Sequence, residues 1–547
     1  MMHAIRSTIG PSWRMPAAVM LLTALIWFLF FHRLADRDLW GSHEARAAQD
    51  AGSMLHYHDW TLPRLTDEQT DLQKPPMYYW LVAATAWVRG TLDEMSVRLP
   101  AAISAALTAL TLALVLLQRG RRIAAIVAAI VLITSQHFTW LARTARIDMP
   151  LTLCLTIAVL NIGLHRRWQI VGFLAIAVAI LLKGPIGLVL PLAVIVADRI
   201  LERVLNGERL GWLSLVWGIP FVTALTLPWF IEANDLTHGE FFRVFFWHHN
   251  FERAMGGSNE LAVHPWWFYG PRLLVDALPW TIPLVPAVFL FLRYGIWRID
   301  REARLGLLWL LVVVAVLSCA KFKRADYILP AHPGLAMLLG CLIERAWLQT
   351  RPALQRAVGV GIAMIVVATI GAWGYWIHVD IPNHEPAREQ RTFARAIREV
   401  APAPATVLFF RVECHPLAFH LGRPINSLLE WENLDIWAGR PGPTYIVMSP
   451  NDVRNWRQYV TAGALEEVFR NTDFSGGKHE RPLVLMRTRP RDFANHGASR
   501  EQTSDSQGPD QHGPAGAKSS RAGGAGGAGL GDRTGQARPP IRNPASG

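Results

Sequence analysis

The sequence predicts a polytopic α-helical membrane protein with a small α/β domain towards its C-terminal end. Of its 547 residues, 51% are apolar and 23 are Trp, and apolar runs long enough to cross a bilayer recur through most of the chain. The net charge of +12 could suggest a nucleic-acid partner. However, the basic residues separate apolar runs and form no basic domain, so we expect a lipid bilayer as partner and no nucleic acid.

Hydropathy predicts about eleven membrane spans, with an upper bound of about thirteen. The first, Met15 to Phe31, follows Arg14 as in a signal peptide but lacks a small-residue cleavage site, so we interpret it as a retained span. The others are expected at 100–118, 123–142, 150–164, 169–182, 184–197, 213–231, 275–293, 305–319, 330–346 and 356–377.

Four basic stretches set the orientation: Arg119 to Arg122, His165 to Arg167, Arg293 to Arg304 and Arg345 to Arg356. The positive-inside rule makes them cytoplasmic. In an inner (plasma) membrane, this puts the N-terminus in the cytoplasm. Loops at about 32–99 and 232–274 then lie outside, with Met77 to Val88 in the interface. Residues 1–378 would form the membrane domain.

The pattern changes after residue 378. Arg388 to Val400 is an amphipathic helix pattern, and residues 406–410, 444–448 and 482–486 are typical of short buried strands. They predict an extracytoplasmic α/β domain over 379–489. Residues 490–547 are mostly Gly, Ala, Ser, Pro and Arg, which predicts a disordered tail.

Ionisable residues gather on the predicted outer side of the membrane. They include Glu44, Lys74, Asp148, Arg253 and the cluster Lys321, Lys323 and Arg324. Cations outside run against the positive-inside rule, so they favour an anionic ligand. Simpler explanations stay open for two further cations. Arg46 could be no more than a salt-bridge partner of Glu44 or Asp50. Lys183 could be a snorkelling residue in a tight turn.

No cofactor is required by the pattern. Cys154, Cys319, Cys341 and Cys414 show no disulfide or metal spacing and are interpreted as packing residues. Histidines 56, 58, 248, 249 and 264 leave room for an extracytoplasmic divalent metal, although no His-x-x-x-His pair is present. Asp36-Arg-Asp38 has the Asp-x-Asp spacing of metal-dependent oligosaccharyltransferases, but beside Arg33 and Arg37 it is more typical of a solvated span end.

Several motifs occur in a fixed order. The chain has Trp40-Gly-Ser-His-Glu-Ala-Arg46, Lys74-Pro-Pro-Met-Tyr-Tyr-Trp80, Ala145-Arg-Ile-Asp-Met-Pro150, Leu182-Lys-Gly-Pro185, Leu227-Pro-Trp-Phe230, Phe245-Phe-Trp-His-His-Asn-Phe-Glu-Arg253, Pro265-Trp-Trp-Phe-Tyr269 and Ala320-Lys-Phe-Lys-Arg-Ala-Asp-Tyr-Ile-Leu-Pro330. This order resembles that of the polyprenyl-phosphate-sugar-dependent membrane glycosyltransferases. That group includes the protein O-mannosyltransferases and the lipid A aminoarabinose transferases.

The resemblance implies a GT-C-like fold and the site residues. It implies catalytic roles for Glu44, Asp148 and His43, with Lys74, Arg46, Arg253, Lys321, Lys323 and Tyr327 binding the donor phosphate. The family usually has Asp where this chain has His43. Glu44 could carry the carboxylate role, His43 could be the base, Asp148 could do more, or His43 could only cap a helix.

The resemblance therefore implies an inverting glycosyltransferase, for a hexose or a pentose. It would use a polyprenyl-phosphate sugar and an unidentified lipid, glycan or protein acceptor outside the membrane. Cations would stabilise the leaving phosphate, and a carboxylate would serve as general base or stabilise the sugar. The alternatives are a transporter or flippase of anionic polyprenyl-linked lipids, which usually shows internal repeats, and a lipid-binding scaffold.

Overall fold

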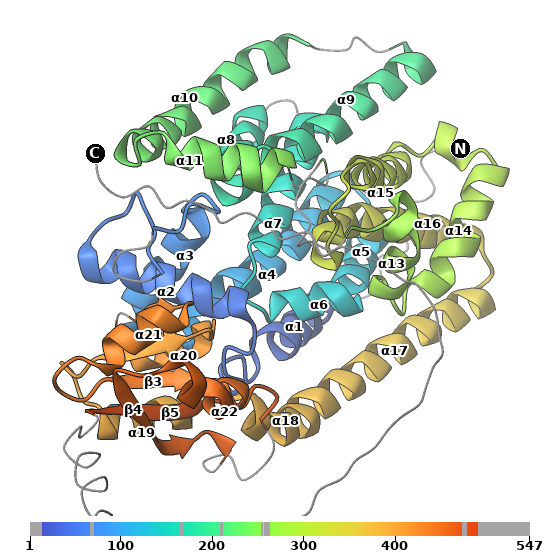
Figure 1. The fold of residues 1–547 in the computed structure, drawn as a ribbon. Helices are drawn as coiled ribbons and strands as arrows, with labels where there is room; N and C mark the ends of the chain where they lie inside the picture. The colour runs from blue at the N-terminus through green and yellow to red at the C-terminus, as the bar shows by residue number, and fades with distance from the viewer. Residues whose placement is uncertain are drawn as a thin grey trace, which may run out of the picture. The chain divides into compact units, whose positions relative to one another are not determined.

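The apolar runs form helices in the order that hydropathy predicts (Figure 1). The structure, a computed structural model, describes residues 14–65, 70–164, 168–207, 212–252, 255, 263–423, 425–472 and 479–490. All of them belong to one unit, Met1–Arg491. The predicted disordered tail, apart from its first residue, lies outside the described residues, and so does Arg253.

The helices before residue 376 are α1 (Arg14–Ile26), α2 (Ser42–Tyr57), α3 (Met77–Arg89), α4 (Glu94–Gln118), α5 (Arg122–Thr134), α6 (Gln136–Ala142), α7 (Asp148–Ala158), α8 (Gln169–Lys183), α9 (Ile186–Asn206), α10 (Leu213–Leu236), α11 (Glu240–Phe242), α13 (Tyr269–Asp276), α14 (Thr281–Arg293), α15 (Arg301–Cys319), α16 (His332–Gln349) and α17 (Pro352–Tyr375). The 3₁₀ and π segments are η1 (Trp27–Phe31), η2 (Val159–Leu164), η4 (Arg243–Glu252), η5 (Trp266–Phe268), η6 (Ile296–Arg298), η7 (Ala325–Ala331) and η8 (Trp376–Asp380).

Five of the described helices are long and apolar enough to cross a membrane, and two bent pairs raise the number to seven. The shorter apolar helices Pro16–Phe31, Asp148–Leu164 and Gln169–Lys183 also lie on expected spans. A polytopic helical membrane protein is therefore confirmed, while the number of spans stays a prediction. One expected span, 123–142, is not straight: α5 and α6 meet at 70°. The bend falls at Ser135, whose backbone is extended.

Small residues let the helices approach closely. At the contact of α15 with α16, a Cβ on Gly306 would lie 2.7 Å from the carbonyl oxygen of Gly334, and a Cβ on Gly334 would lie 2.8 Å from that of Gly306. No side chain fits at either position. Such glycine contacts are typical of membrane helix pairs, where van der Waals packing drives association.

A separate buried cluster joins the elements that carry the site. Ala45 of α2, Tyr78 of α3, Leu151 of α7 and Leu182 of α8 belong to it. Their packing holds the first turn of α2 near the first turn of α7 and the last turn of α8. Polar side chains at these three helix ends are thereby brought together.

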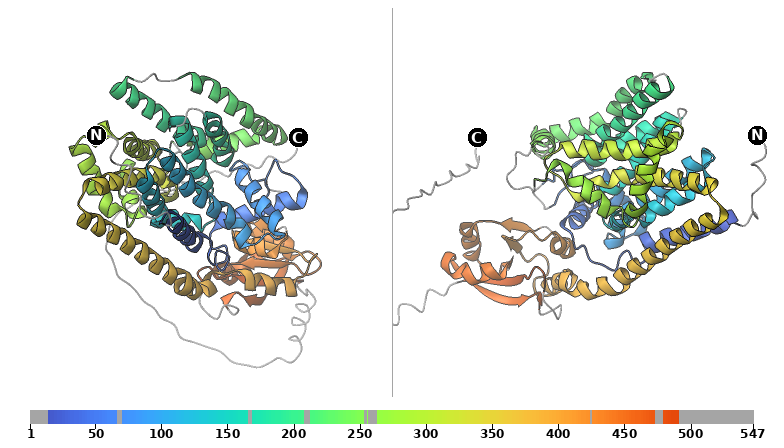
Figure 2. Two further views of the ribbon diagram at one scale, coloured as in Figure 1. Left: turned by 180° about the vertical axis from the view of Figure 1, so that it is seen from behind. Right: turned by 90° about the vertical axis from the view of Figure 1, so that its right-hand side faces the viewer.

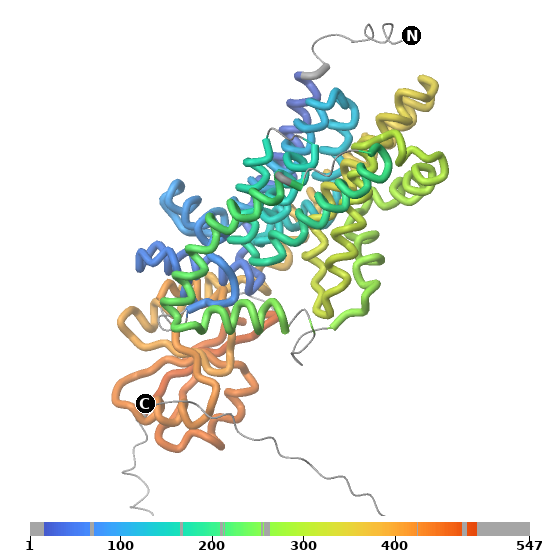
Figure 3. The backbone as a smooth tube through the Cα atoms, turned by 90° about the horizontal axis from the view of Figure 1, so that it is seen from above, coloured from blue at the N-terminus to red at the C-terminus, as the bar shows by residue number. Residues whose placement is uncertain are grey.

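The chain after α17 forms a small α/β part (Figures 2 and 3). Figure 2 shows α17 running along one side of the helical part towards it. Its elements are α18 (Ile381–Arg388), α19 (Arg391–Val400), β1 (Val407–Phe410), α20 (His415–Leu421), β2 (Asn426–Leu428), α21 (Trp431–Ala438), β3 (Tyr445–Met448), α22 (Pro450–Tyr459), β4 (Gly463–Arg470) and β5 (Val484–Pro490).

The five strands form one sheet in the order β2-β1-β3-β5-β4. Strands β1, β2 and β3 are parallel, and β5 pairs antiparallel with both β3 and β4. All four residues of β1 are buried, because both faces of the sheet are covered. Phe409 packs with Phe393 of α19 on one face, and Phe410 with Trp431 of α21 on the other. This double covering explains why the strands are continuous apolar runs.

Candidate active site

The carboxylate of Glu44 is completely occupied by protein groups. Arg98 donates to both of its oxygens at 2.9 and 3.1 Å, Arg37 approaches them at 3.1 and 3.0 Å, and the backbone N–H of Ala145 donates at 3.0 Å. Glu44 is 1% exposed. Burial alone would raise its pKa, but the two guanidinium groups lower that pKa to about 2. Glu44 is thus a fixed anion between two arginines. Because both of its oxygens already accept hydrogen bonds from protein groups, Glu44 is not placed to accept a proton from a substrate.

His43, next to Glu44, faces a different set of groups. Its Nε2 lies 2.9 Å from Nη1 of Arg324, and since Arg can only donate, this nitrogen accepts. Burial, followed by the charges of Lys74, Arg146, Arg324 and other cations, lowers the pKa of His43 to about 2. His43 is therefore a neutral acceptor for Arg324, and a weak base.

Lys74 stands out among the surrounding cations. The half-buried ammonium makes no ion pair or hydrogen bond with any residue that the structure describes, whereas nearby Arg46 is paired with Asp71 at 2.8 Å. Burial lowers the pKa of Lys74 to about 8, with Asp71 and Arg46 acting in opposite directions. Among the described residues, Lys74 therefore has no counter-ion at pairing distance, and its ammonium could pair with an anionic ligand.

Asp148, the first residue of α7, provides a carboxylate beside these cations. It is 5% exposed and accepts a short hydrogen bond from Nζ of Lys183, the last residue of α8. Lys183 also lies 3.8 Å from the ring centroid of Tyr327. Lys183 is therefore more than a snorkelling turn residue, because it bridges the acid and the aromatic ring.

Arg146 links the cluster to the late loop. It pairs with Asp326 at 3.0 Å, and Asp326 in turn lies 3.8 Å from the buried His137. Arg146 acts electrostatically on His43, on Lys74 and on Asp148. We define the cationic cluster by the residues that meet here: His43, Arg46, Lys74, Arg146, Asp148, Lys183, Arg324 and Tyr327.

Lys321 and Lys323, which are predicted to bind the phosphate, do not belong to the cationic cluster. Lys323 is 3% exposed, and its ammonium donates to the carbonyl oxygens of His264 and Ala320, so it fastens two loops together. Lys321 is exposed and makes no side-chain contact with the cationic cluster among the described residues. Arg253, which is also predicted to bind the phosphate, lies outside the described residues.

Sequence reasoning missed Arg146 and underrated Arg324 and Lys183. Arg146 lies two residues before Asp148, and Arg324 lies in the motif already noted, so the motifs carried a signal. Arg98, one of the two arginines that hold Glu44, gave no such signal, because 54 residues separate it from Glu44.

The arrangement can hold an anion against a carboxylate. Five cations lie with Asp148 around the ends of α2, α7 and α8, the loop before α3 and the loop before η7. Arg46 and Arg146 are already paired with Asp71 and Asp326, whereas Lys74 makes no ion pair among the described residues. Such a site can bind the phosphate of a substrate and stabilise additional charge on it as a bond breaks.

Comparisons with known proteins identify a family model and several relatives to which the chain is similar. The family described as dolichyl-phosphate-mannose-protein mannosyltransferase matches residues 73–229, which include Lys74, Arg98, Asp148 and Lys183. An undecaprenyl phosphate-alpha-4-amino-4-deoxy-L-arabinose arabinosyl transferase of Pectobacterium carotovorum subsp. carotovorum is 31% identical over 60% of this chain and 58% of its own. One from Pseudomonas aeruginosa PAO1 is 29% identical over 62% of each chain.

Solved structures show the same fold. The crystal structure of ArnT from Cupriavidus metallidurans bound to undecaprenyl phosphate has a TM-score of 0.70 at 20% identity, covering 86% of this chain and 98% of that chain. An Archaeoglobus fulgidus oligosaccharyltransferase reaches 0.52 at 11% identity, covering 81% and 71%. The chain spans about three fifths of the length of the first of the arabinosyl transferases that it matches. The predicted resemblance is confirmed: this chain is similar to the lipid-linked-sugar transferases and shares the fold of ArnT.

Proposed function

We propose that this protein is an inverting glycosyltransferase that moves a sugar from a polyprenyl-phosphate donor to a lipid, glycan or protein acceptor. The observation that carries the proposal is the cationic cluster. Five cations lie around Asp148, and only Arg46, Arg146 and Lys183 among them are paired with acids, so that Lys74 has no ion pair among the described residues. The amino-sugar donor in the names of the arabinosyl transferases is the first donor to test.

The proposed reaction assigns a role to each charged group. Lys74 and Arg324 bind the donor phosphate, with Arg46 and Arg146 adding positive potential from their ion pairs. The acceptor oxygen bonds to the anomeric carbon as the bond from this carbon to the phosphate oxygen breaks. The acceptor proton passes to Asp148, whose charge Lys183 maintains in the ground state. The leaving phosphate gains negative charge, and the loss of one donor to such a group typically costs about 3–4 kcal/mol.

Under this proposal the protein lies in the inner membrane with eleven spans and its N-terminus in the cytoplasm. The ion pairs of the predicted cytoplasmic loops support this orientation. Arg119 pairs with Glu302 at 2.8 Å, and Arg121 pairs with Asp300 at 2.7 Å and with Glu344 at 2.6 Å. Stretches that the positive-inside rule assigns to one side therefore meet each other, and the cationic cluster collects the residues assigned to the other side.

Under the same topology, the α/β part over 379–489 is extracytoplasmic. Its contacts with the outer loops support this assignment: the side chain of Gln49 in α2 donates to the carbonyl oxygen of His415 in α20 at 2.7 Å. Cysteine labelling at Ala325, beside the cluster, and at Arg351, between α16 and α17, tests the topology. We expect labelling from outside at residue 325 only.

The decisive test follows the fate of the donor. The purified chain would be incubated with undecaprenyl-phosphate-linked aminoarabinose and an extract of membrane lipids, and the release of undecaprenyl phosphate measured by mass spectrometry. We expect release by the native chain and at least about a hundredfold less by Asp148→Asn. A chain that binds the donor but never releases its phosphate would favour the transporter, and movement of donor across proteoliposomes would establish it.

A further inference from the structure

A second polar cluster lies where the α/β part meets the membrane part, separate from the cationic cluster. It consists of Asp38, in the segment leading into α2, of Glu94 at the start of α4, and of His420 in α20. One ligand atom from each lies within 4.8 Å of the other two. Asp38 and Glu94 are buried, and the side chain of His420 is 12% exposed. Three distant segments thus bring two carboxylates and an imidazole to one point.

The carboxylates at this cluster outnumber the guanidinium groups in direct contact with them. The carboxylates of Asp38, Glu94 and Glu385 face the single guanidinium of Arg391. Arg391 donates to Glu385 at 2.8 Å but lies 3.4 Å from Oε1 of Glu94, and this buried oxygen accepts no hydrogen bond among the described residues. Arg98 and Arg37, the next cations, are both bound to Glu44, and Arg98 also attracts Glu94 and Asp38 from a greater distance. A buried carboxylate oxygen without a hydrogen bond is costly unless a nearby cation compensates it.

We propose that Asp38, Glu94 and His420 bind a divalent transition-metal ion of the zinc class, which fastens the α/β part to the segment that leads into α2. The mixed donor set favours this class, because imidazole and carboxylate together suit Zn²⁺, whereas Ca²⁺ and Mg²⁺ prefer oxygen alone. A water molecule would complete four-coordination.

The geometry is close to what the ion needs. Nε2 of His420 lies 2.7 Å from Oδ1 of Asp38 and 4.0 Å from Oε1 of Glu94. These distances lie on either side of the spacing of about 3.3 Å between ligands of a tetrahedral zinc ion with bonds near 2.0 Å. The proton that His420 shares with Asp38 would leave on binding, as metal binding to imidazole requires.

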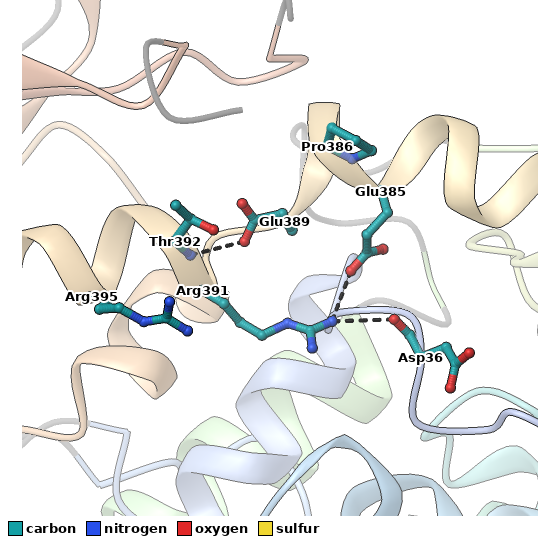
Figure 4. A pocket seen from close by; sticks show the side chains of 7 residues that line it. All are labelled: Asp36, Glu385, Pro386, Glu389, Arg391, Thr392 and Arg395. Atoms are coloured by element: carbon teal, nitrogen blue, oxygen red, sulfur yellow. Dashed lines mark hydrogen bonds and ion pairs between the residues drawn. The ribbon is translucent and has the colours of Figure 1, made fainter. Parts of the chain in front are cut away.

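A cavity lies beside the cluster, at Arg391 and Glu385. This cavity, of roughly 490 Å³, is lined by Asp36, Glu385, Glu389 and Arg391, among others. Figure 4 shows Arg391 reaching towards Glu385 and the chain at Asp36, between the two helices that border the cavity. Its three carboxylates outnumber the guanidinium groups of Arg391 and Arg395 in the same lining, which favours the approach of a hydrated cation.

The bound metal would act on structure and not on the reaction. Asp38 also accepts the backbone N–H of Gln390 at 2.7 Å, so the α/β part already holds this segment, five residues before His43. A metal would add a bond that joins α20 to the start of α4. We therefore expect a stability effect that needs no donor substrate.

The test uses the full chain in detergent, stripped with a chelator, and the metal alone as probe. Titration calorimetry with Zn²⁺ should show one tight site per chain, and Zn²⁺ should raise the unfolding midpoint. Glu94→Gln and His420→Gln should each weaken this site by more than about tenfold. Asp36→Asn removes a nearby carboxylate that is no ligand, so it should bind as the native chain does. Titration with Co²⁺ should give the visible absorption bands of a tetrahedral site in the native chain and lose them in both ligand variants.

Glu94→Gln is the stricter variant, because Glu94 makes only the longer contact with Arg391 and with His420, and its replacement removes a buried charge. The inference is wrong if Glu94→Gln binds Zn²⁺ as tightly as the native chain, or if Zn²⁺ leaves the unfolding midpoint of the native chain unchanged. In either case Asp38 and His420 form an ion pair only.

Discussion

The guanidinium group of Arg98 holds both carboxylate oxygens of Glu44, at 2.9 and 3.1 Å, although 54 residues separate the two in the chain. The same guanidinium donates to the carbonyl oxygens of Leu34, Arg37 and Asp38. Arg98 thus fixes the loop before α2 from the first turns of α4. Since Ala145 also donates to Glu44, the pair sets the relative position of His43 and of the segment that carries Asp148.

Glu44→Gln should therefore act on stability. It would leave Arg37 and Arg98 buried without their anion, a change that typically costs about 3–5 kcal/mol. We expect a clear fall in the unfolding midpoint, which is measured by tryptophan fluorescence in detergent. Glu432→Gln, at an exposed position of α21, is the control and should leave the midpoint in place. If the variant has normal stability but no longer transfers sugar, Glu44 takes part in catalysis.

Asp148→Asn should have the opposite profile. The amide keeps the shape of the side chain but loses the charge and basicity that accept a proton, so turnover should fall by at least about a hundredfold. Binding of the donor should stay within about threefold, measured by displacement of a fluorescent polyprenyl phosphate. Lys183→Gln is the matched variant. It should lower turnover less, because Lys183 adjusts the acid but does not take the proton. Full turnover by Asp148→Asn would exclude Asp148 as the base.

Lys74 should give the donor affinity a pH dependence. Its pKa of about 8 means that the ammonium is charged below pH 8 and loses its charge as the pH rises through this value. The apparent second-order rate constant kcat/KM, which reports the free enzyme, should therefore fall above about pH 8. Lys74→Arg should be less active, since a planar fork does not replace a point charge, but this fall should disappear because Arg stays charged. If kcat/KM of Lys74→Arg falls above about pH 8 as it does in the native chain, the titration of another group causes this fall.

Much of the fold could be predicted from the sequence, because single residues and local runs determine it. The apolar runs predicted the helices. The basic stretches were predicted only to share one side of the membrane; that Arg121 of one stretch meets Glu344, beside another, at 2.6 Å agrees with this prediction. Strands β1, β3 and β5 lie on the three segments predicted as strands. The bend at Ser135 could not be predicted, since it depends on tertiary packing around α6.

The site was predictable in its residue types and less so in their roles. Five of the motifs contribute one or two residues each to the cationic cluster, so their order along the chain was informative. The ion-pair partners of these residues could not be predicted from the sequence, because an ion pair such as that of Asp148 with Lys183 depends on how α7 packs against α8. Asp38 was interpreted as part of a solvated span end, but it is 1% exposed, because the α/β part covers it.

His43 offers the sharpest distinction between the two possible roles of the residue that replaces the family's usual Asp. As a neutral acceptor for Arg324, it should tolerate His43→Gln, whose amide oxygen can accept the same hydrogen bond, with turnover within about tenfold. His43→Leu leaves Arg324 without this acceptor and should lose donor affinity. His43→Asp should fold well, because Lys74 and several arginines surround it, but its carboxylate would compete with the phosphate and weaken donor binding.

The pH profile separates these roles without relying on the size of the loss. With a pKa of about 2, His43 stays neutral at every pH at which the enzyme is assayed, so the acidic limb of kcat/KM should have the same shape in the native chain and in His43→Gln. If the native chain shows an inflection near pH 6.5 that His43→Gln lacks, the imidazole titrates during the reaction. His43 would then be the working base, and Asp148 would be left to stabilise the charge of the sugar.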